Sequence, residues 1–188
     1  SWSGDQPAIN SIADAKADPS NGFFNAKWRA DYEGISRCNA VLRVVEKVTD
    51  MTDEEKQILR AEARFLRAHY YFDLKKMFNM VPYVDETTTE YKVPNDQDIW
   101  PKIEDDFKFA YEKLGDIAPA VGRVNKWAAG AYLGKTYLFQ KKFGEAVTIF
   151  NDVITKGKTS KGEAYGLYDN FADNFDPAAK NGKESVFA

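Results

Sequence analysis

The single histidine of the sequence lies in a charged stretch, Arg60 to Phe72, that reads RAEARFLRAHYYF. An imidazole near carboxylates is a common composition of acid–base and metal sites. His69 follows Glu62 by seven residues, two helical turns that keep the side chains apart, and it precedes Asp73 by four. One histidine and one aspartate supply at most half of a zinc site. The residues therefore favour neither catalysis nor metal binding at this position.

Three arginines accompany the histidine and share one face of the predicted helix. Spacings of four and then three residues place Arg60, Arg64 and Arg67 in one stripe. Such a stripe could bind an anion or a carboxylate ligand. We favour the alternative, in which the guanidinium groups form salt bridges and caps between neighbouring helices.

Motifs of the common enzyme classes are missing from the sequence. It has no nucleophile elbow, phosphate-binding loop, dinucleotide fingerprint or HExxH. Asp105 and Asp106 are adjacent, so they point to different sides of a helix. We therefore predict no catalytic residue, no metal site and no cofactor. An enzyme, such as a hydrolase, would need turnover that is abolished by changing a carboxylate pair.

Aromatic residues among polar ones offer a different chemistry. Aromatics make up 14% of the chain. Flat rings stack on the apolar faces of sugar rings, while amides and carboxylates take the hydroxyl groups. Two stretches combine these residue types, one before residue 26 and one after residue 80, with the rings of Trp2, Phe23, Phe24, Tyr83 and Tyr91. For each ring alone, anchoring of a loop in the core is the more common role.

Composition limits the class of protein. A chain of 188 residues can form one domain with a real core, and a net charge of −3 with scattered basic residues argues against nucleic-acid binding. The one cysteine, Cys38, allows no internal disulfide and reads as a small buried residue on a helix. No apolar run approaches the length of a membrane span. The chain starts at Ser1 without a signal segment, and we expect both ends to be cut from a longer protein.

Helices must position these residues, because apolar side chains recur at spacings of three and four through most of the chain. A capping box, Thr52 to Glu55, marks the start of a long helix whose two apolar stripes predict a core helix. Pro82 follows its end. The predicted helices span about 28–48, 52–78, 98–114, 125–140 and 143–156.

Irregular segments are predicted between and around the helices. Residues 1–25 read as an irregular segment with one short helix, and 79–95 as a long inserted loop. Gly157 stops the last helix, and the tail beyond it is rich in loops. Residues 184–188 read as the start of a strand.

The last two predicted helices carry a repeat signature. The tetratricopeptide pattern places Leu-Gly-x2-Tyr on one helix and Ala-x3-Phe on the next. Leu133 and Gly134 lead to Tyr137 here, and Ala146 is followed by Phe150. Small side chains let the two helices touch, and the rings fill the space beside them. This spacing predicts a tetratricopeptide-like hairpin.

A weaker copy of the same pattern occurs earlier in the chain. Ala68 and Tyr71 match the first helix of a hairpin and Ala110 matches the second, with the long loop between them. The sequence thus predicts an all-α fold, an α-α superhelix of tetratricopeptide-like helix hairpins with long inserted loops. We expect a single domain over 1–188, with the clearest hairpin at 125–157.

Five blocks of the sequence, in order along nearly the whole chain, resemble the SusD/RagB family. The strongest is EARFLRAHYYF, Glu62 to Phe72, with Val81-Pro82 after it. The others are Trp28-x3-Tyr32-x2-Ile35-x3-Asn39, Ile103-x2-Asp106-x3-Ala110-x3-Leu114, Gly122-Arg123-Val124 through Tyr137-Leu138, and Asn181-x2-Glu184-Ser185-Val186-Phe187.

This resemblance implies a function and a location. Members of the family are non-catalytic, surface-exposed lipoproteins of the outer membrane of Gram-negative bacteria. They bind glycans, or in some members peptides, and cover a TonB-dependent, SusC-like transporter that takes up the nutrient. The resemblance therefore implies an oligosaccharide or polysaccharide ligand, a SusC-like partner, attachment by an N-terminal lipid and no cofactor.

The resemblance also places ligand residues in the loops before the Trp28 helix, although no motif fixes them. The family's lipidated cysteine is absent, and Cys38, in the middle of a helix, is not the lipid site. Family members are longer, and by this resemblance we expect a downstream region that supplies part of the binding surface to lie outside the given sequence. As carbohydrate-binding residues we nominate Trp2, Asp5, Asn21, Phe23, Phe24 and Asn25.

A second interpretation is a tetratricopeptide module whose groove binds a peptide or a partner helix. It predicts short loops, with a polar or basic lining on the first helices of successive repeats. The long loop 79–95 argues against it.

Overall fold

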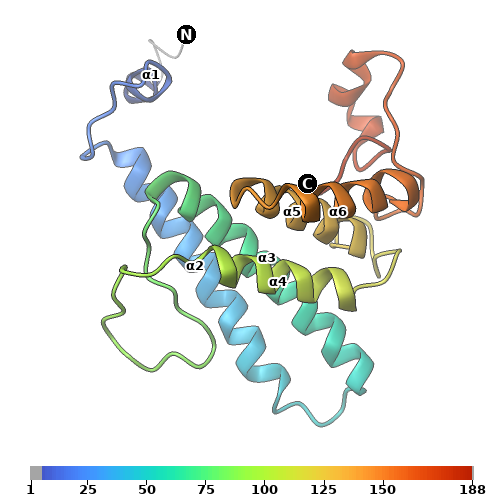
Figure 1. Cartoon of the computed structure of the whole chain (residues 1–188), viewed down its shortest axis with the longest axis horizontal. Helices are drawn as coiled ribbons and strands as arrows, with labels where there is room; N and C mark the ends of the chain where they lie inside the picture. The colour runs from blue at the N-terminus through green and yellow to red at the C-terminus, as the bar shows by residue number, and fades with distance from the viewer. Residues whose placement is uncertain (1–5, 188) are drawn as a thin grey trace.

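The structure is a computed structural model in which residues 6–187 are described. This part of the chain is helical and contains no β-strand apart from one isolated bridge, between Lys158 and Ala164. The α-helices are α1 (Pro7–Ala13), α2 (Gly22–Val45), α3 (Asp53–Phe78), α4 (Trp100–Lys113), α5 (Lys126–Phe139) and α6 (Phe143–Lys156), and two short 3-10 helices follow, η1 (Phe171–Phe175) and η2 (Pro177–Ala179). The predicted all-α class is confirmed (Figure 1).

Side-chain caps fix where the long helices begin. α2 begins at Gly22, earlier than predicted, because the side-chain oxygen of Asn21 accepts a hydrogen bond from the backbone N–H two residues on (3.1 Å). The segment predicted as irregular up to residue 25 therefore ends sooner, and it holds one short helix, α1. α3 begins at Asp53 with the predicted capping box, in which Thr52 and Glu55 each accept a hydrogen bond from the backbone N–H of the other.

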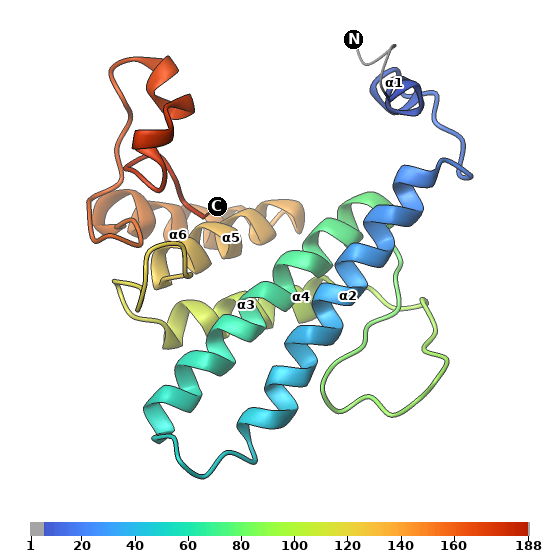
Figure 2. The same cartoon turned by 180° about the vertical axis from the view of Figure 1, so that it is seen from behind.

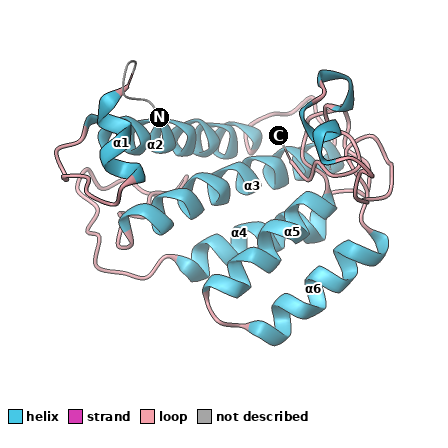
Figure 3. Ribbon diagram, turned by 90° about the horizontal axis from the view of Figure 1, so that it is seen from above, coloured by secondary structure: helices cyan, strands magenta, loops and turns pink. Residues whose placement is uncertain are grey.

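The helices pack in chain order, each against the next, from α2 to α6. Neighbours run antiparallel: Lys27 near the start of α2 pairs with Asp73 near the end of α3 (2.8 Å), and Glu46, just after α2, pairs with Arg60 near the start of α3 (2.6 Å). Figure 2 shows this stack from behind, and Figure 3 shows the successive layers from above. The arrangement is a stack of helical hairpins, as predicted.

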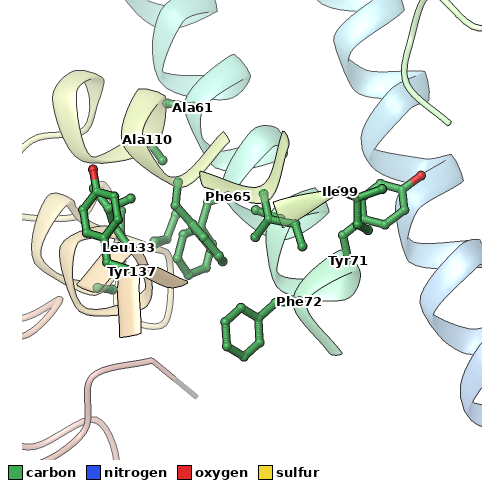
Figure 4. Close-up of a cluster of buried hydrophobic side chains, with 14 of the residues drawn as sticks. Ala61, Phe65, Tyr71, Phe72, Ile99, Ala110, Leu133 and Tyr137 are labelled. Atoms are coloured by element: carbon green, nitrogen blue, oxygen red, sulfur yellow. The ribbon is translucent and has the colours of Figure 1, made fainter. Parts of the chain in front are cut away.

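α3 lies at the centre of the stack and contributes most to the core. Phe65, Tyr71 and Leu74 have no exposed surface, and Phe72 is also buried. Figure 4 shows Phe65 and Phe72 of α3 in one cluster with Ala110 of α4 and Leu133 of α5. The wide apolar arc of this helix is needed because it packs against α2 on one side and α4 on the other.

The hairpin of α5 and α6 has the contact that the repeat signature predicts. Gly134 lies so close to α6 that an added Cβ would stand 2.7 Å from the ring of Phe150. At Gly130, one turn earlier, an added Cβ would stand 2.9 Å from the ring of Tyr111 on α4, and Ala146 on α6 is buried. Small residues therefore bring the helices together and aromatic rings fill the space beside them, which confirms the tetratricopeptide-like hairpin.

α3 and α4 form a hairpin of the same kind, with a long loop between them. Ala68 and Ala110 are both completely buried where the two helices meet. Residues 79–99 leave the end of α3, run beside α2 and bulge away from the stack before they return to α4 (Figure 1). The predicted long insertion is therefore present.

The end of the chain differs from the sequence prediction. Residues 184–187 form a turn and a bend with irregular backbone rather than a strand, because the described residues offer no neighbouring strand to pair with. The ring of Phe187 instead packs edge-on against Phe65 of α3, with centroids 5.0 Å apart, and lies near Tyr132 of α5. The aromatic residue is thus used to anchor the tail on the helical core.

Within residues 6–187, no helix has both the length and the apolar character required to cross a membrane.

Candidate functional site

The arginine stripe of α3 forms salt bridges to other helices, as predicted. Arg60 pairs with Glu46 after α2, and Arg64 pairs with both Asp105 and Asp106 of α4 (2.5 and 2.6 Å). The two aspartates do face differently, since the side chain of Asp105 is 75% exposed and that of Asp106 is 2% exposed. These carboxylates occupy the guanidinium groups, so the stripe is a set of helix junctions.

Arg67 is the most deeply buried member of the stripe. Its side chain is 4% exposed and donates two hydrogen bonds to Asp106, from Nε (2.7 Å) and Nη2 (2.9 Å). Burial alone disfavours the charge of Arg67, but the hydrogen bonds and the attraction of Asp106 outweigh it and raise the pKa. Arg67 also donates to Asn39 Oδ1 of α2 (3.0 Å) and to Glu86 of the inserted loop. One guanidinium therefore joins α2, α3, α4 and the loop.

His69 lies among aromatic rings. Its ring centroid is 5.4 Å from that of Tyr132 and 5.7 Å from that of Tyr70, and its Nδ1 is buried without a hydrogen-bond partner in the described part of the chain. Burial lowers the pKa of His69 below its ordinary value, so the imidazole is neutral near pH 7. The charges of Asp31 and Asp73 oppose this lowering of the His69 pKa, and Lys27 forms salt bridges with both carboxylates. This arrangement fits a half-buried histidine that packs between helices.

A cavity of about 230 Å³ opens at the base of the inserted loop. Tyr83 lines it, and the Lys102 ammonium lies over the Tyr83 ring, 5.7 Å from the centroid. The apolar part of the lining comes from residues at both ends of the loop, and the polar part comes from its return to α4 and from the first turn of that helix. The lining residues are Val81, Tyr83, Val93, Pro94, Asp96, Gln97, Asp98, Ile99 and Lys102.

The cavity has the chemistry of a sugar subsite. An aromatic ring and aliphatic side chains can contact the C–H faces of a pyranose, while carboxylate, amide and ammonium groups can bind hydroxyls. Asp98 is oriented by the buried ammonium of Lys75 (2.9 Å). Burial raises the pKa of Tyr83 further above its ordinary value, and the protonated hydroxyl can donate a hydrogen bond. The volume lies below the 300–1,000 Å³ that is typical of small-molecule pockets, so only part of an oligosaccharide would fit.

The nominated residues before the Trp28 helix lie elsewhere. Trp2 and Asp5 are outside the described residues. The amide nitrogen of Asn21 donates to the carbonyl of Ala8 (2.9 Å) and to Ser11 Oγ (3.2 Å), while its oxygen caps α2, so this side chain is satisfied within the protein.

The other nominated residues belong to the first turn of α2. Phe23 and Phe24 are half-buried and Asn25 is exposed. None of the three is among the residues that line the loop cavity. The N-terminal turn of α2 and the start of the loop do lie at the same end of the stack, because the rings of Trp28 and Phe78 pack edge-on with centroids 5.1 Å apart. Their role in ligand binding stays a prediction.

The polar residues of the cavity were not nominated from the sequence. Tyr83 stood out as an aromatic residue in a polar loop, but Asp96 and Gln97 form part of an ordinary polar run, and Lys102 belongs to α4. The one sequence feature that could have indicated them is their position on both sides of Ile99. This buried residue anchors the loop where it returns to α4. Only the fold shows that the two ends of the loop come together.

Comparison with known proteins places the chain in a family. A sequence profile described as "Starch-binding associating with outer membrane", of the SusD-like group, matches residues 3–138. The chain therefore belongs to the SusD-like family, which confirms the resemblance seen in the sequence.

Individual relatives agree with this assignment. The SusD-like protein P2 of Formosa agariphila is 30% identical over 144 residues, which are 70% of this chain and 28% of that protein. A solved laminarin-binding SusD-like protein is 29% identical, with a TM-score of 0.83, over 98% of this chain and 41% of that one. Surface glycan-binding protein A from Bacteroides thetaiotaomicron, solved with laminarihexaose, has the same fold at 22% identity, with a TM-score of 0.82, over 100% of this chain and 39% of that one. The chain thus spans less than half the length of these relatives.

Proposed function

We propose that the protein binds an oligosaccharide or polysaccharide without cleaving it. The observation that carries this proposal is the similarity to the laminarin-binding SusD-like protein, which extends over 98% of the chain at 29% identity. The cavity beside Tyr83 supports it, because it combines a ring, aliphatic walls and hydroxyl-binding groups. A cavity of this size leaves most of a glycan in water, so we expect weak binding of isolated sugars.

The same proposal includes a place in nutrient uptake. The family description, starch binding in association with the outer membrane, supports a surface-exposed location in the outer membrane. By resemblance to the family, we propose a lipid-anchored protein that hands the glycan to a TonB-dependent, SusC-like transporter. Co-purification of such a transporter with the tagged protein from its native membrane would support this part, and recovery of the protein alone would contradict it.

Titration calorimetry with laminarin and laminarihexaose is the first test of glycan binding, because relatives with these ligands share the fold. Soluble starch and xylogluco-oligosaccharides serve as the comparison set. Product analysis after prolonged incubation tests for cleavage. Binding of one of these carbohydrates without release of shorter products is the expected result.

A pair of tyrosine variants in the same loop locates the ligand. Tyr83→Ala removes the ring that lines the cavity, and we expect about tenfold weaker binding, on the scale of one lost aromatic contact. Tyr91→Ala is the matched control, because Tyr91 is 97% exposed and lies outside the cavity lining. Loss of binding in the Tyr91 variant alone would move the site to the tip of the loop. Failure to bind any carbohydrate, with binding of a peptide instead, would contradict the proposal.

A further inference from the structure

The backbone on both sides of Tyr83 is held by hydroxyl groups from the helices. Tyr32 of α2 donates a hydrogen bond to the carbonyl of Pro82 (2.7 Å). The hydroxyl of Tyr71, on α3, accepts from the N–H of Val84 (2.6 Å) and donates to its carbonyl (2.9 Å). The peptide unit before Tyr83 and the one after it are therefore both fixed.

A second layer of contacts supports this arrangement. Asn39 Nδ2 also donates to the carbonyl of Val84 (3.0 Å), and Asn39 Oδ1 accepts from Arg67 (3.0 Å). Because a guanidinium only donates, the bond from Arg67 sets which end of the Asn39 amide faces the loop. Arg67 is itself fixed by the buried Asp106 and reaches Glu86, two residues after Val84. Buried side chains of the helical core thus hold the loop in one position.

The ring of Tyr83 is held as well as its backbone. It packs on the ring of Tyr71 with centroids 4.8 Å apart and an angle of 30° between the planes. Tyr83 therefore has a fixed orientation at the wall of the cavity before any ligand arrives. Fixing a contact residue in advance removes an ordering cost that binding would otherwise carry.

We propose that Tyr71 and Arg67 are positioning residues of the carbohydrate site: acting through Val84 and Glu86, they hold the loop so that Tyr83 stands ready at the cavity. This inference rests on the proposed function, since it assigns the purpose of the contacts to ligand binding at Tyr83. The EARFLRAHYYF stretch then serves the site from a distance, and its residues need not touch the ligand.

Tyr71→Phe is the sharpest test, because it removes only the hydroxyl that holds Val84 and keeps the ring that supports Tyr83. Tyr165→Phe is the matched control, since the buried Tyr165 hydroxyl has no hydrogen-bond partner in the described residues. Glu86→Gln is a second variant that removes the charged contact to Arg67 at a half-buried position and leaves the core intact. Three measurements apply to each variant: thermal unfolding, laminarihexaose affinity by calorimetry, and hydrogen exchange of the segment 81–90 by mass spectrometry with and without the sugar.

For Tyr71→Phe we expect faster exchange of the segment 81–90 and a roughly two- to tenfold loss of laminarihexaose affinity, the range for one lost hydrogen bond. The sugar should restore part of the protection, because it now has to order the loop. In the wild-type protein, where the loop is already ordered, the sugar should change the exchange little. Glu86→Gln should show the same pattern more weakly, and Tyr165→Phe should match the wild type in all three measurements.

A lower melting temperature with unchanged affinity and unchanged loop exchange would overturn the inference, because the network would then serve only stability. Faster loop exchange with unchanged affinity would overturn it as well, since Tyr83 would not need to be held. If the wild-type protein binds none of the carbohydrates, the proposed function fails. The hydrogen-exchange measurement still tests separately whether Tyr71 holds the loop. If the segment 81–90 stays protected from exchange in Tyr71→Phe, the hydroxyl has no role in holding it.

Discussion

Two helical hairpins of one stack are closed in different ways. α5 and α6 are joined by a turn over residues 140–142, whereas α3 and α4 are separated by the loop over residues 79–99 (Figure 1). The α5–α6 contact is apolar and close, with Gly134 against Phe150. The α3–α4 contact adds buried ions, with Arg64 and Arg67 of α3 on Asp106 of α4.

The difference shows what a long insertion requires. A short turn limits the positions of its two helices by its length, so close packing suffices to fix the hairpin. A long loop imposes no such limit, and its own backbone needs hydrogen-bond partners. The ions of α3 and α4 meet the first need, because Arg67 joins the two helices through Asp106. Side chains of α2 and α3 meet the second, because Tyr32, Tyr71 and Asn39 hydrogen-bond to the loop backbone. We infer that the α3–α4 hairpin depends on directional polar contacts, whereas the α5–α6 hairpin depends on close apolar packing.

The largest expected effect comes from removing one guanidinium group from the α3–α4 hairpin. Arg67→Met leaves the buried carboxylate of Asp106 with one partner fewer, and we expect the free energy of unfolding to fall by about 3–5 kcal/mol. Denaturant unfolding followed by circular dichroism measures it. Arg37→Met is the matched control, because the Arg37–Glu33 pair is exposed and should contribute less than about 1 kcal/mol. Equal losses in the two variants would remove the distinction between the hairpins.

A larger side chain at Gly134 tests the close packing of the α5–α6 hairpin. Gly134→Leu places a side chain against the ring of Phe150, and we expect a loss of about 1–3 kcal/mol in the free energy of unfolding. Gly144→Ala, on the facing helix α6, is the control, since nothing lies within 4 Å of its added Cβ. Alanine there should be neutral or stabilise the helix by up to about 1 kcal/mol. A tolerated leucine would mean that the hairpin can spread, against the inference drawn from its short turn.

The caps that start the first helix of each hairpin offer a finer comparison. Asn125 accepts a hydrogen bond from the N–H of Ala128 and donates to the carbonyls of two loop residues, Asp116 and Lys158 (3.1 and 2.8 Å), whereas Thr52 caps α3 in solvent. Removal of a helix cap costs about 0.5–2 kcal/mol. We expect Asn125→Ala at the upper end of that range and Thr52→Ala at the lower end, measured by thermal unfolding. The reverse order would show that the loops around α5 hold without Asn125.

Sequence patterns were sufficient for the scaffold. The apolar spacing and the capping box of Thr52 predict α3 nearly to the residue, and Gly134 with Ala146 predicts the α5–α6 contact. These features are local, or depend on two adjacent helices, so they can be seen in a linear sequence. The sequence predicted that the arginine stripe forms salt bridges between helices, but it did not identify the partners, Asp106 and Glu86.

The candidate site could not be read in the same way. Its wall, Tyr83, is separated in sequence from Lys102, and only the path of the loop brings the two together. The orientation of Tyr83 depends on Tyr71 and on other residues whose sequence pattern is that of a core helix. The nomination of Asn21 followed from its position before the Trp28 helix and its residue type, and the structure shows the amide capping α2 and holding α1. Residue type alone does not separate an asparagine that binds ligand from one that binds backbone.

His69 lies at the seam between the two hairpins, where this α3 residue packs against Tyr132 of α5. Burial lowers the pKa of His69 below its ordinary value of 6.5. Below pH 6.5 the unfolded chain binds a proton at this position that the folded protein binds only at lower pH. The free energy of unfolding therefore falls as the pH falls through this window, and the imidazole makes no such contribution above it.

His69→Phe should abolish this pH dependence while keeping a ring at the seam. We expect similar stability of the two proteins at pH 7.5 and an advantage of the variant that grows as the pH falls to 5.5, where its limit for one proton over one pH unit is about 1.4 kcal/mol. Urea unfolding at pH 7.5, 6.5 and 5.5 measures the difference, and the absence of any other histidine makes it specific to this residue. Parallel losses in the two proteins would mean that His69 takes up its proton in the folded state. The seam would then be more accessible to water than its aromatic neighbours Tyr70 and Tyr132 suggest.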